Sequence, residues 1–183
     1  MDCINFNEFK LAKKSVKKNK YESNAEKFFS NAYYSSDIKD KIKFYTISIK
    51  LKPSFIDAYF NRGMVFLGIE DYKRAAIEFT KAIHEDSRDS EAYENRAFTY
   101  YNLKKYSSSI KDYTNALKLI PENKNIYLNR GTIYYKIKNY ENAISDYMKA
   151  LNCKEKDPSF YHKIYTNCND KLNKKILPFV NFK

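Results

Sequence analysis

The sequence predicts an all-α protein built of stacked pairs of antiparallel helices, and three observations support that fold class. Only three glycines and four prolines occur in 183 residues, which leaves little material for the tight turns of a sheet protein. The chain returns every 34 residues to one phrase, as YFNRGMVF (59–66), YENRAFTY (93–100) and YLNRGTIY (127–134). Apolar residues within each period follow helical spacing. A fixed period of this length indicates a repeat of helical pairs.

Three frames of 34 residues, 56–89, 90–123 and 124–157, follow one another without a gap. Seven columns agree across them, with aromatic residues at positions 4, 11, 17 and 24 and small residues at positions 8, 20 and 27. In the first frame these are Tyr59, Phe66, Tyr72 and Phe79, then Gly63, Ala75 and Ala82. The columns resemble the tetratricopeptide repeat family. The resemblance implies a solenoid in which antiparallel helix pairs stack in a right-handed superhelix with a concave groove.

Each frame holds a first and a second helix, joined by a short polar segment that allows only a hairpin. The second helix of the third frame shows one apolar stripe, formed by Tyr140, Ala143, Ile144, Tyr147, Ala150 and Leu151. Small residues at positions 8 and 20 indicate where two helices approach closely. We therefore expect the closest approaches within repeats at Gly63–Ala75, Ala97–Ser109 and Gly131–Ala143.

The flanking segments complete the predicted organisation. Residues 22–55 form a diverged, tetratricopeptide-like helical hairpin, because Phe29, Lys41 and Ser48 replace its three small residues. Residues 158–173 form a C-terminal capping helix that covers the last apolar face, as a solenoid requires. Residues 174–183 are a tail in which Pro178 prevents a simple continuation of the helix, and residues 1–21 are a basic N-terminal segment.

Composition and motifs argue against several other classes of protein. Three cysteines without framework spacing predict reduced thiols, and no stretch resembles a signal peptide or could span a bilayer. These features favour the cytoplasm or the nucleus. The chain has two histidines and no catalytic, phosphate-binding or zinc motif. We expect no enzyme, no catalytic residue, no cofactor and no metal site.

Position 6 is asparagine in all three frames, as Asn61, Asn95 and Asn129. An amide carries both donors and an acceptor, so it can pair with the backbone of an extended peptide. The resemblance implies that this position faces the groove, and we expect the three amides to face solvent in the free protein. The alternative is that asparagine is common at this repeat position and contacts only water.

Apolar residues accompany the asparagines at the positions that line the groove in this family. They are Phe60, Met64, Phe98, Tyr101, Leu128 and Tyr135. Packing against neighbouring helices is the alternative for each of them. Apolar residues on a concave face are typical of a surface that holds a partner.

Position 7 is arginine in each frame, and position 23 is then an acid. The pairs are Arg62 with Glu78, Arg96 with Asp112, and Arg130 with Asp146. In the diverged frame both positions change together, to Phe28 and Phe44. This correlation predicts a contact within one repeat. We expect a partly exposed ion pair that contributes about 0–1 kcal/mol.

These features together predict an adaptor that holds an extended or helical peptide segment of another protein in the groove. A clamp for acidic chaperone tails is not expected, because the family's clamp cations are missing and only its middle asparagine is matched, by Asn95 from residue 56 or by Asn61 from residue 22. The alternative function uses the Lys-rich ends, which hold +8 of the net charge of +12, to bind nucleic acid or an anionic membrane. The densest run of lysines is Lys10–Lys20, and the competing interpretation is that this basic end is merely solvated.

Overall fold

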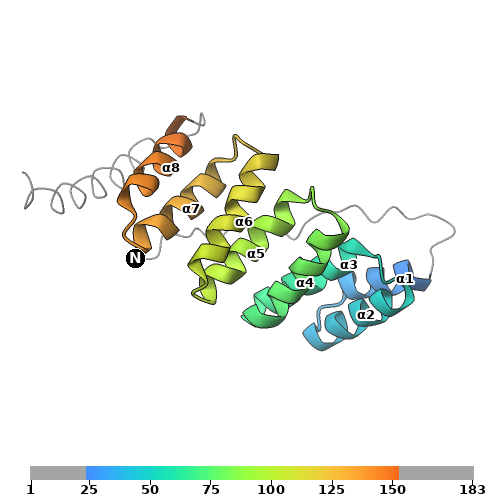
Figure 1. The fold of residues 1–183 in the computed structure, drawn as a ribbon. Coiled ribbons are helices and arrows are strands. Elements are labelled where there is room, and N and C mark those ends of the chain that lie inside the picture. Colours follow the sequence, from blue (N-terminus) through green and yellow to red (C-terminus); the bar gives the residue numbers. More distant parts are fainter. Residues whose placement is uncertain (1–23, 153–183) are drawn as a thin grey trace, which may run out of the picture. The chain divides into compact units, whose positions relative to one another are not determined.

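The computed structural model describes residues 24–152, which form eight α-helices and no strand (Figure 1). The predicted all-α fold is confirmed, and the six helices expected from residue 56 onward are all present. The helices are α1 (Asn24–Tyr34), α2 (Ile38–Leu51), α3 (Ile56–Gly68), α4 (Tyr72–Glu85), α5 (Ser90–Asn102), α6 (Tyr106–Leu119), α7 (Lys124–Lys136) and α8 (Tyr140–Asn152). The predicted basic segment, capping helix and tail lie outside the described residues.

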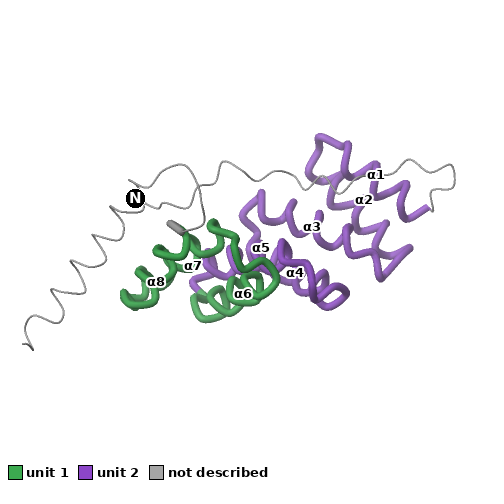
Figure 2. The backbone as a smooth tube through the Cα atoms, turned by 90° about the horizontal axis from the view of Figure 1, so that it is seen from above, with its two compact units in different colours: residues 1–4, 105–183 green, residues 5–104 purple. Residues whose placement is uncertain are grey.

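The described residues fall into two compact units (Figure 2). The N-terminal unit carries α1–α5 and ends at Lys104, and the C-terminal unit begins at Lys105 and carries α6–α8. In the N-terminal unit, α1 packs on α2 and α3 packs on α4, while α2 also contacts α3 and α4 contacts α5. In the C-terminal unit, α7 packs on both α6 and α8. Each unit therefore consists of consecutive helices packed side by side.

Side-chain caps start most of the helices at fixed repeat positions. At position 16, Asp71 Oδ1 accepts a hydrogen bond from the Arg74 N–H at 3.0 Å, and Asp37 caps α2 in the same way. At position 34, Asp89 Oδ1 accepts from the N–H groups of Glu91 and Ala92. Such caps satisfy helix N–H groups that have no partner within the helix and stabilise it by about 1 kcal/mol.

The turn between the two helices of a repeat has the same geometry in all three frames. Position 15 lies in the left-handed region, with φ of 58° at Glu70, 59° at Lys104 and 63° at Lys138. The N–H of each donates to the carbonyl three residues earlier, at 2.9–3.0 Å. Residues other than Gly, Asn and Asp rarely adopt this conformation, yet no glycine stands at these three positions.

Glycine is instead required inside the helices, where a neighbouring ring comes very close. A Cβ added to Gly63 would lie 2.9 Å from Phe79 Cε1, and one added to Gly131 would lie 2.9 Å from Tyr147 Cε1. The atoms nearest to an added Cβ thus belong to Phe79 and Tyr147 and not to the expected partners Ala75 and Ala143. The small residue at position 8 makes room for the ring at position 24 of the next helix.

Two of the three diverged residues of the first hairpin, Phe29 and Ser48, have a structural role. Phe29 is buried between the rings of Tyr45 and Phe55, with centroid distances of 5.5 and 5.0 Å. Ser48 is fully buried, and its hydroxyl donates to the carbonyl of Ala25 at 2.8 Å. The buried hydroxyl therefore has a partner, which removes most of the cost of replacing alanine there.

Candidate functional site

A pocket of about 560 Å³ lies in the N-terminal unit, between the first hairpin, α3 and α5. Its wall is mostly apolar and comes from the five helices α1–α5 and the turn after α3. The lining residues are Tyr33, Ile38, Lys41, Tyr45, Asn61, Met64, Val65, Leu67, Gly68, Ile69, Glu70, Tyr72 and Phe98. A pocket of this size and character is typical of a ligand site.

Three of the predicted groove residues come together at this pocket. Met64 on α3 and Phe98 on α5 both stand at position 9 of successive repeats, and Asn61 lies one turn before Met64. Met64 is half-buried, whereas Phe98 is almost completely buried. The structure therefore assembles one apolar surface from helices that are 34 residues apart in the sequence.

The expectation that the asparagine amides face solvent is wrong for Asn61 and Asn95, which are 4% and 7% exposed. Nδ2 of Asn61 donates to the Asp57 carbonyl at 2.7 Å, and Nδ2 of Asn95 donates to the Glu91 carbonyl at 2.8 Å. Each amide thus bonds to its own helix one turn back, as short polar side chains often do. Among the described residues, no donor reaches Oδ1 of either asparagine.

The remaining predicted groove residues do not line this pocket. Phe60 is fully buried, with its ring 5.7 Å from that of Phe79, so the structure assigns it to the core and not to a groove. Tyr101 is half-buried on α5. In the C-terminal unit, Asn129 is half-buried on α7. Leu128 and Tyr135, on the same helix, pack against the cluster of Ala143 and Tyr147.

Acidic side chains stand on the N-terminal halves of the first helices, one or two turns before residues that line the pocket. Glu94 stands one turn before Phe98 on α5 and is half-buried. Burial, and to a smaller extent the charge of Glu91, raise the pKa of Glu94 to about 7. This carboxyl group therefore changes its charge near neutral pH.

Arg62 and Arg130 form the predicted contacts within their repeats, while the contact of Arg96 with Asp112 stays a prediction. Arg62 holds Glu78 through Nε and Nη2, with N–O distances of 2.8–3.2 Å, and Arg130 holds Asp146 at 2.7 and 2.8 Å. The rings of Phe28 and Phe44 take the same place in the first hairpin, with centroids 6.1 Å apart. The Arg62 and Glu78 side chains are only 13% and 9% exposed, so the expectation of a partly exposed pair was wrong.

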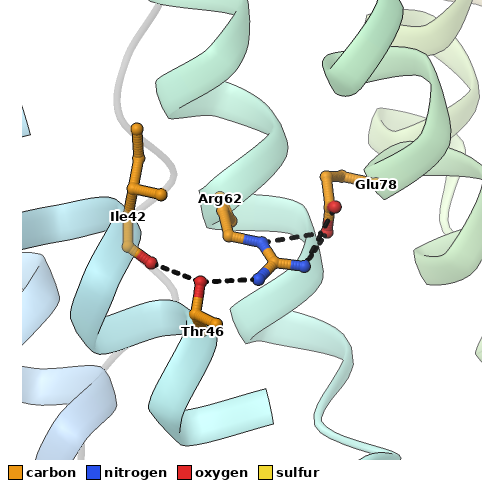
Figure 3. A network of polar contacts seen from close by, with 4 residues as sticks. All are labelled: Ile42, Thr46, Arg62 and Glu78. Carbon is orange, nitrogen blue, oxygen red and sulfur yellow. Dashed lines mark hydrogen bonds and ion pairs between the residues drawn. The ribbon is translucent and has the colours of Figure 1, made fainter. Parts of the chain in front are cut away.

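Each arginine also binds the preceding repeat, which sequence reasoning missed. Arg62 Nη1 donates to Thr46 Oγ1 at 2.8 Å, and Thr46 in turn donates to the Ile42 carbonyl at 2.6 Å (Figure 3). Arg96 and Arg130 bind Thr80 and Thr114 at 3.1 and 2.8 Å. The signal was present in the sequence, because a threonine stands 16 residues before each of the three arginines.

The part of the chain that the structure describes holds neither a candidate metal site nor a helix that could cross a membrane. No group of three or more His, Cys, Asp or Glu side chains in residues 24–152 could hold a metal ion. None of the eight described helices is both long and apolar enough to cross a bilayer.

Known proteins resemble the chain over most of its length. Residues 56–88, 90–123 and 125–157 match sequence models of the tetratricopeptide repeat. A crystal structure of MamA has 18% identity and a TM-score of 0.66, over 85% of this chain and 98% of that one. No curated protein matches the sequence.

Two solved tetratricopeptide domains are similar as well. The first such domain of Spaghetti (RPAP3), bound to the HSP90 peptide SRMEEVD, has 21% identity and a TM-score of 0.59, covering 64% of this chain and 92% of that one. The corresponding domain of Arabidopsis OM64 has 26% identity and a TM-score of 0.57, covering 62% of this chain and 96% of that one. These likenesses agree with a fold built of helical pairs.

Proposed function

Because the chain belongs to the tetratricopeptide repeat family, we propose that it is an adaptor that holds a peptide segment of another protein in the pocket of the N-terminal unit. The family as a whole consists of protein-binding scaffolds that are typically not enzymes. The observation that carries the proposal is the apolar pocket of about 560 Å³. Burial of apolar side chains against Met64, Leu67 and Phe98 supplies most of the affinity.

Polar contacts to the peptide backbone come from the asparagines at position 6. Oδ1 of Asn61 and Asn95 has no donor among the described residues, and Asn61 lines the pocket. Either oxygen can accept a hydrogen bond from a peptide N–H, while Nδ2 stays bound to its own helix. Because both amides are already anchored, little conformational entropy is lost when they bind.

An acidic carboxylate terminus is not the ligand that we propose. The relative Spaghetti (RPAP3) is bound to the peptide SRMEEVD, which ends in acidic residues. In this chain, position 5 of the first two repeats holds Phe60, which is buried, and Glu94, which is an acid. At position 5 an acidic peptide would meet repulsion and no cation, although Lys41 of α2 lines the pocket.

Binding of a selected peptide to matched variants tests the proposal. A random-peptide display library is panned on the full chain, and the enriched peptide is titrated into wild type, Met64→Gln and Ile77→Gln while fluorescence anisotropy is recorded. Ile77 is 55% exposed on α4 and does not line the pocket, so its substitution is the control. Met64→Gln should weaken binding about tenfold, as loss of a buried apolar contact does, and Ile77→Gln should not.

Equal binding by Met64→Gln and wild type would contradict the proposal. Recruitment to nucleic acid or an anionic membrane is the alternative, and it depends on Lys10–Lys20, which lie outside the described residues. Salt-sensitive retention on heparin that is lost when residues 1–21 are deleted would support it instead.

A further inference from the structure

We propose that the pocket of the N-terminal unit selects a peptide in which a Lys or Arg stands two or three positions from an apolar anchor residue. The apolar residue enters the pocket beside Met64 and Phe98, and the cation binds the carboxylate of Glu94. This inference rests on the proposed peptide-binding function and adds the chemistry of the partner.

The place of Glu94 on α5 puts it one turn before a residue that lines the pocket. Residues four apart on a helix lie on the same face, and Phe98, one turn after Glu94, lines the pocket. Glu91 lies three residues before Glu94 on that face and brings a second negative charge. The same surface of α5 is therefore apolar toward its C-terminal end and acidic toward its N-terminal end.

The neighbouring first helices of this unit repeat the same gradient. Asp57 precedes Asn61 by one turn on α3, and Glu26 occupies position 5 of the first hairpin on α1. Met64, Leu67 and Tyr33 follow toward the C-terminal ends and line the pocket. The corresponding positions 2 and 5 of α7 in the C-terminal unit are Asn125 and Leu128, so this acidity belongs to the N-terminal unit.

Glu94 lacks a compensating charge of its own. Among the described residues, no side chain donates a hydrogen bond to its carboxylate, and its charged neighbour is the like-charged Glu91. A half-buried carboxylate without a partner is less stable than one in water, and a ligand cation would remove this penalty. Binding energy gained in this way discriminates strongly between cationic and acidic ligands.

A second feature points to a ligand independently of the acids. Asn61 lines the pocket and is 96% buried, since its exposure is 4%. Its Oδ1 nevertheless has no donor among the described residues. A peptide N–H between the apolar and cationic residues would satisfy this oxygen. The apolar pocket, the open acceptor and the carboxylate thus match three successive features of one extended segment.

The spacing follows from helix and strand dimensions. Phe98 and Glu94 are separated by about 6 Å along α5, and Phe98 and Glu91 by about 10 Å, at roughly 1.5 Å per residue. An extended peptide advances about 3.3 Å per residue, so the two side chains lie two or three positions apart. General attraction cannot explain such a preference, because the chain carries a net charge of +12 that repels cationic peptides.

The test is a double-mutant cycle on the panned peptide. Full-length wild type and Glu94→Gln are each titrated, at pH 7.5 and 150 mM salt, with the enriched peptide and with its Lys/Arg→Gln version. Glu141→Gln, an exposed acid on α8, is the matched control. We expect the peptide change and Glu94→Gln each to weaken binding about tenfold, with little further loss when the two are combined.

The outcomes separate this inference from the proposed function. Failure to enrich any peptide whose binding depends on Met64 would overturn both. Enriched peptides that depend on Met64 but carry no Lys or Arg, or that bind Glu94→Gln as tightly as wild type, would overturn the inference alone. The effect of the Lys/Arg→Gln change in the peptide is measured on wild-type protein. This measurement can therefore contradict the inference even if Glu94→Gln does not fold.

Discussion

Arg62 joins two repeats, because its Nη1 donates to the hydroxyl of Thr46 at 2.8 Å while its other nitrogens hold Glu78. Thr46 belongs to the preceding hairpin and Glu78 to the arginine's own repeat. Arg130 repeats the arrangement with Thr114 and Asp146 in the C-terminal unit. Burial lowers the pKa of Arg130, but the hydrogen bond and charge of Asp146 outweigh it and raise that pKa. The guanidinium groups that donate these hydrogen bonds remain charged, and the network fixes the register of successive repeats.

Removal of Arg62 alone should strongly destabilise the protein. Arg62→Phe leaves the Glu78 carboxylate buried without its partner, and we expect the free energy of unfolding to fall by about 3–5 kcal/mol. The double substitution Arg62→Phe with Glu78→Phe copies the Phe28–Phe44 pair of the first hairpin and should recover most of that loss. Urea unfolding of the single and double variants measures the difference. A double variant no more stable than Arg62→Phe would show that the two pairs are not equivalent.

Glycine at position 8 should be required where a ring approaches and dispensable elsewhere. Gly63→Ala places a Cβ at 2.9 Å from Phe79, and the strain should cost about 1–3 kcal/mol. Gly68→Ala, on the same helix, has no atom within 4 Å of the added Cβ and should stabilise the protein by about 0.5–1 kcal/mol. Thermal unfolding monitored by circular dichroism distinguishes them. Equal melting temperatures for the two variants would contradict this account of the repeat's small residue.

Turn positions whose backbone lies in the left-handed region should accept glycine readily. Lys138 has φ of 63°, so Lys138→Gly relieves strain and should raise the free energy of unfolding by about 1 kcal/mol. Lys111→Gly, within α6, should instead lower it by about 1 kcal/mol. Chemical unfolding of both variants provides the comparison. Destabilisation of similar size in the two would indicate that the Lys138 side chain has a role beyond its backbone conformation.

The pKa of Glu94 predicts an unusual dependence of stability on pH. Because this pKa rises from 4.5 to about 7 on folding, the folded protein binds more protons than the unfolded chain between those values. Wild type should therefore lose stability relative to Glu94→Gln as pH rises through that window, by about 3 kcal/mol once pH exceeds 7. Urea unfolding at pH 4.5 and pH 8 tests this, with Glu141→Gln as control. A constant difference between the two pH values would rule out the shifted pKa.

Peptide binding should also depend on the titration of Glu94, but affinity should rise with pH where stability falls. A ligand cation favours the ionised form of Glu94, so binding below pH 7 releases a proton and affinity should increase from pH 6 to pH 8. Glu91 on α5 and Asp57 on α3 are the other acids at this end of the surface. The increase should be absent in Glu94→Gln. Anisotropy titrations across this range measure it, and an unchanged slope in the variant would assign the pH dependence to another group.

The 34-residue periodicity was sufficient to predict the helices, and a difference between the repeats predicted one side-chain contact. The joint change of Arg62 and Glu78 to Phe28 and Phe44 in the first hairpin predicted that positions 7 and 23 touch. The threonine partner was missed because each repeat was considered by itself. Helical spacing placed Asn61 correctly on α3, but it could not show that the amide bonds to its own helix. Burial of Glu94 depends on surrounding helices, which no local pattern contains.

The central claim, that a peptide binds in the pocket of the N-terminal unit, can be tested directly by methyl NMR. The chain has three methionines, of which Met64 lines the pocket and Met148 is 48% exposed on α8. The full chain is labelled with ¹³C at the methionine methyl groups, and the panned peptide is titrated into it, with Met64→Gln used to assign the Met64 signal. We expect the Met64 signal to shift with saturation while that of Met148 stays unchanged. A peptide that binds without moving the Met64 signal would contradict the claim and place the interaction on another surface.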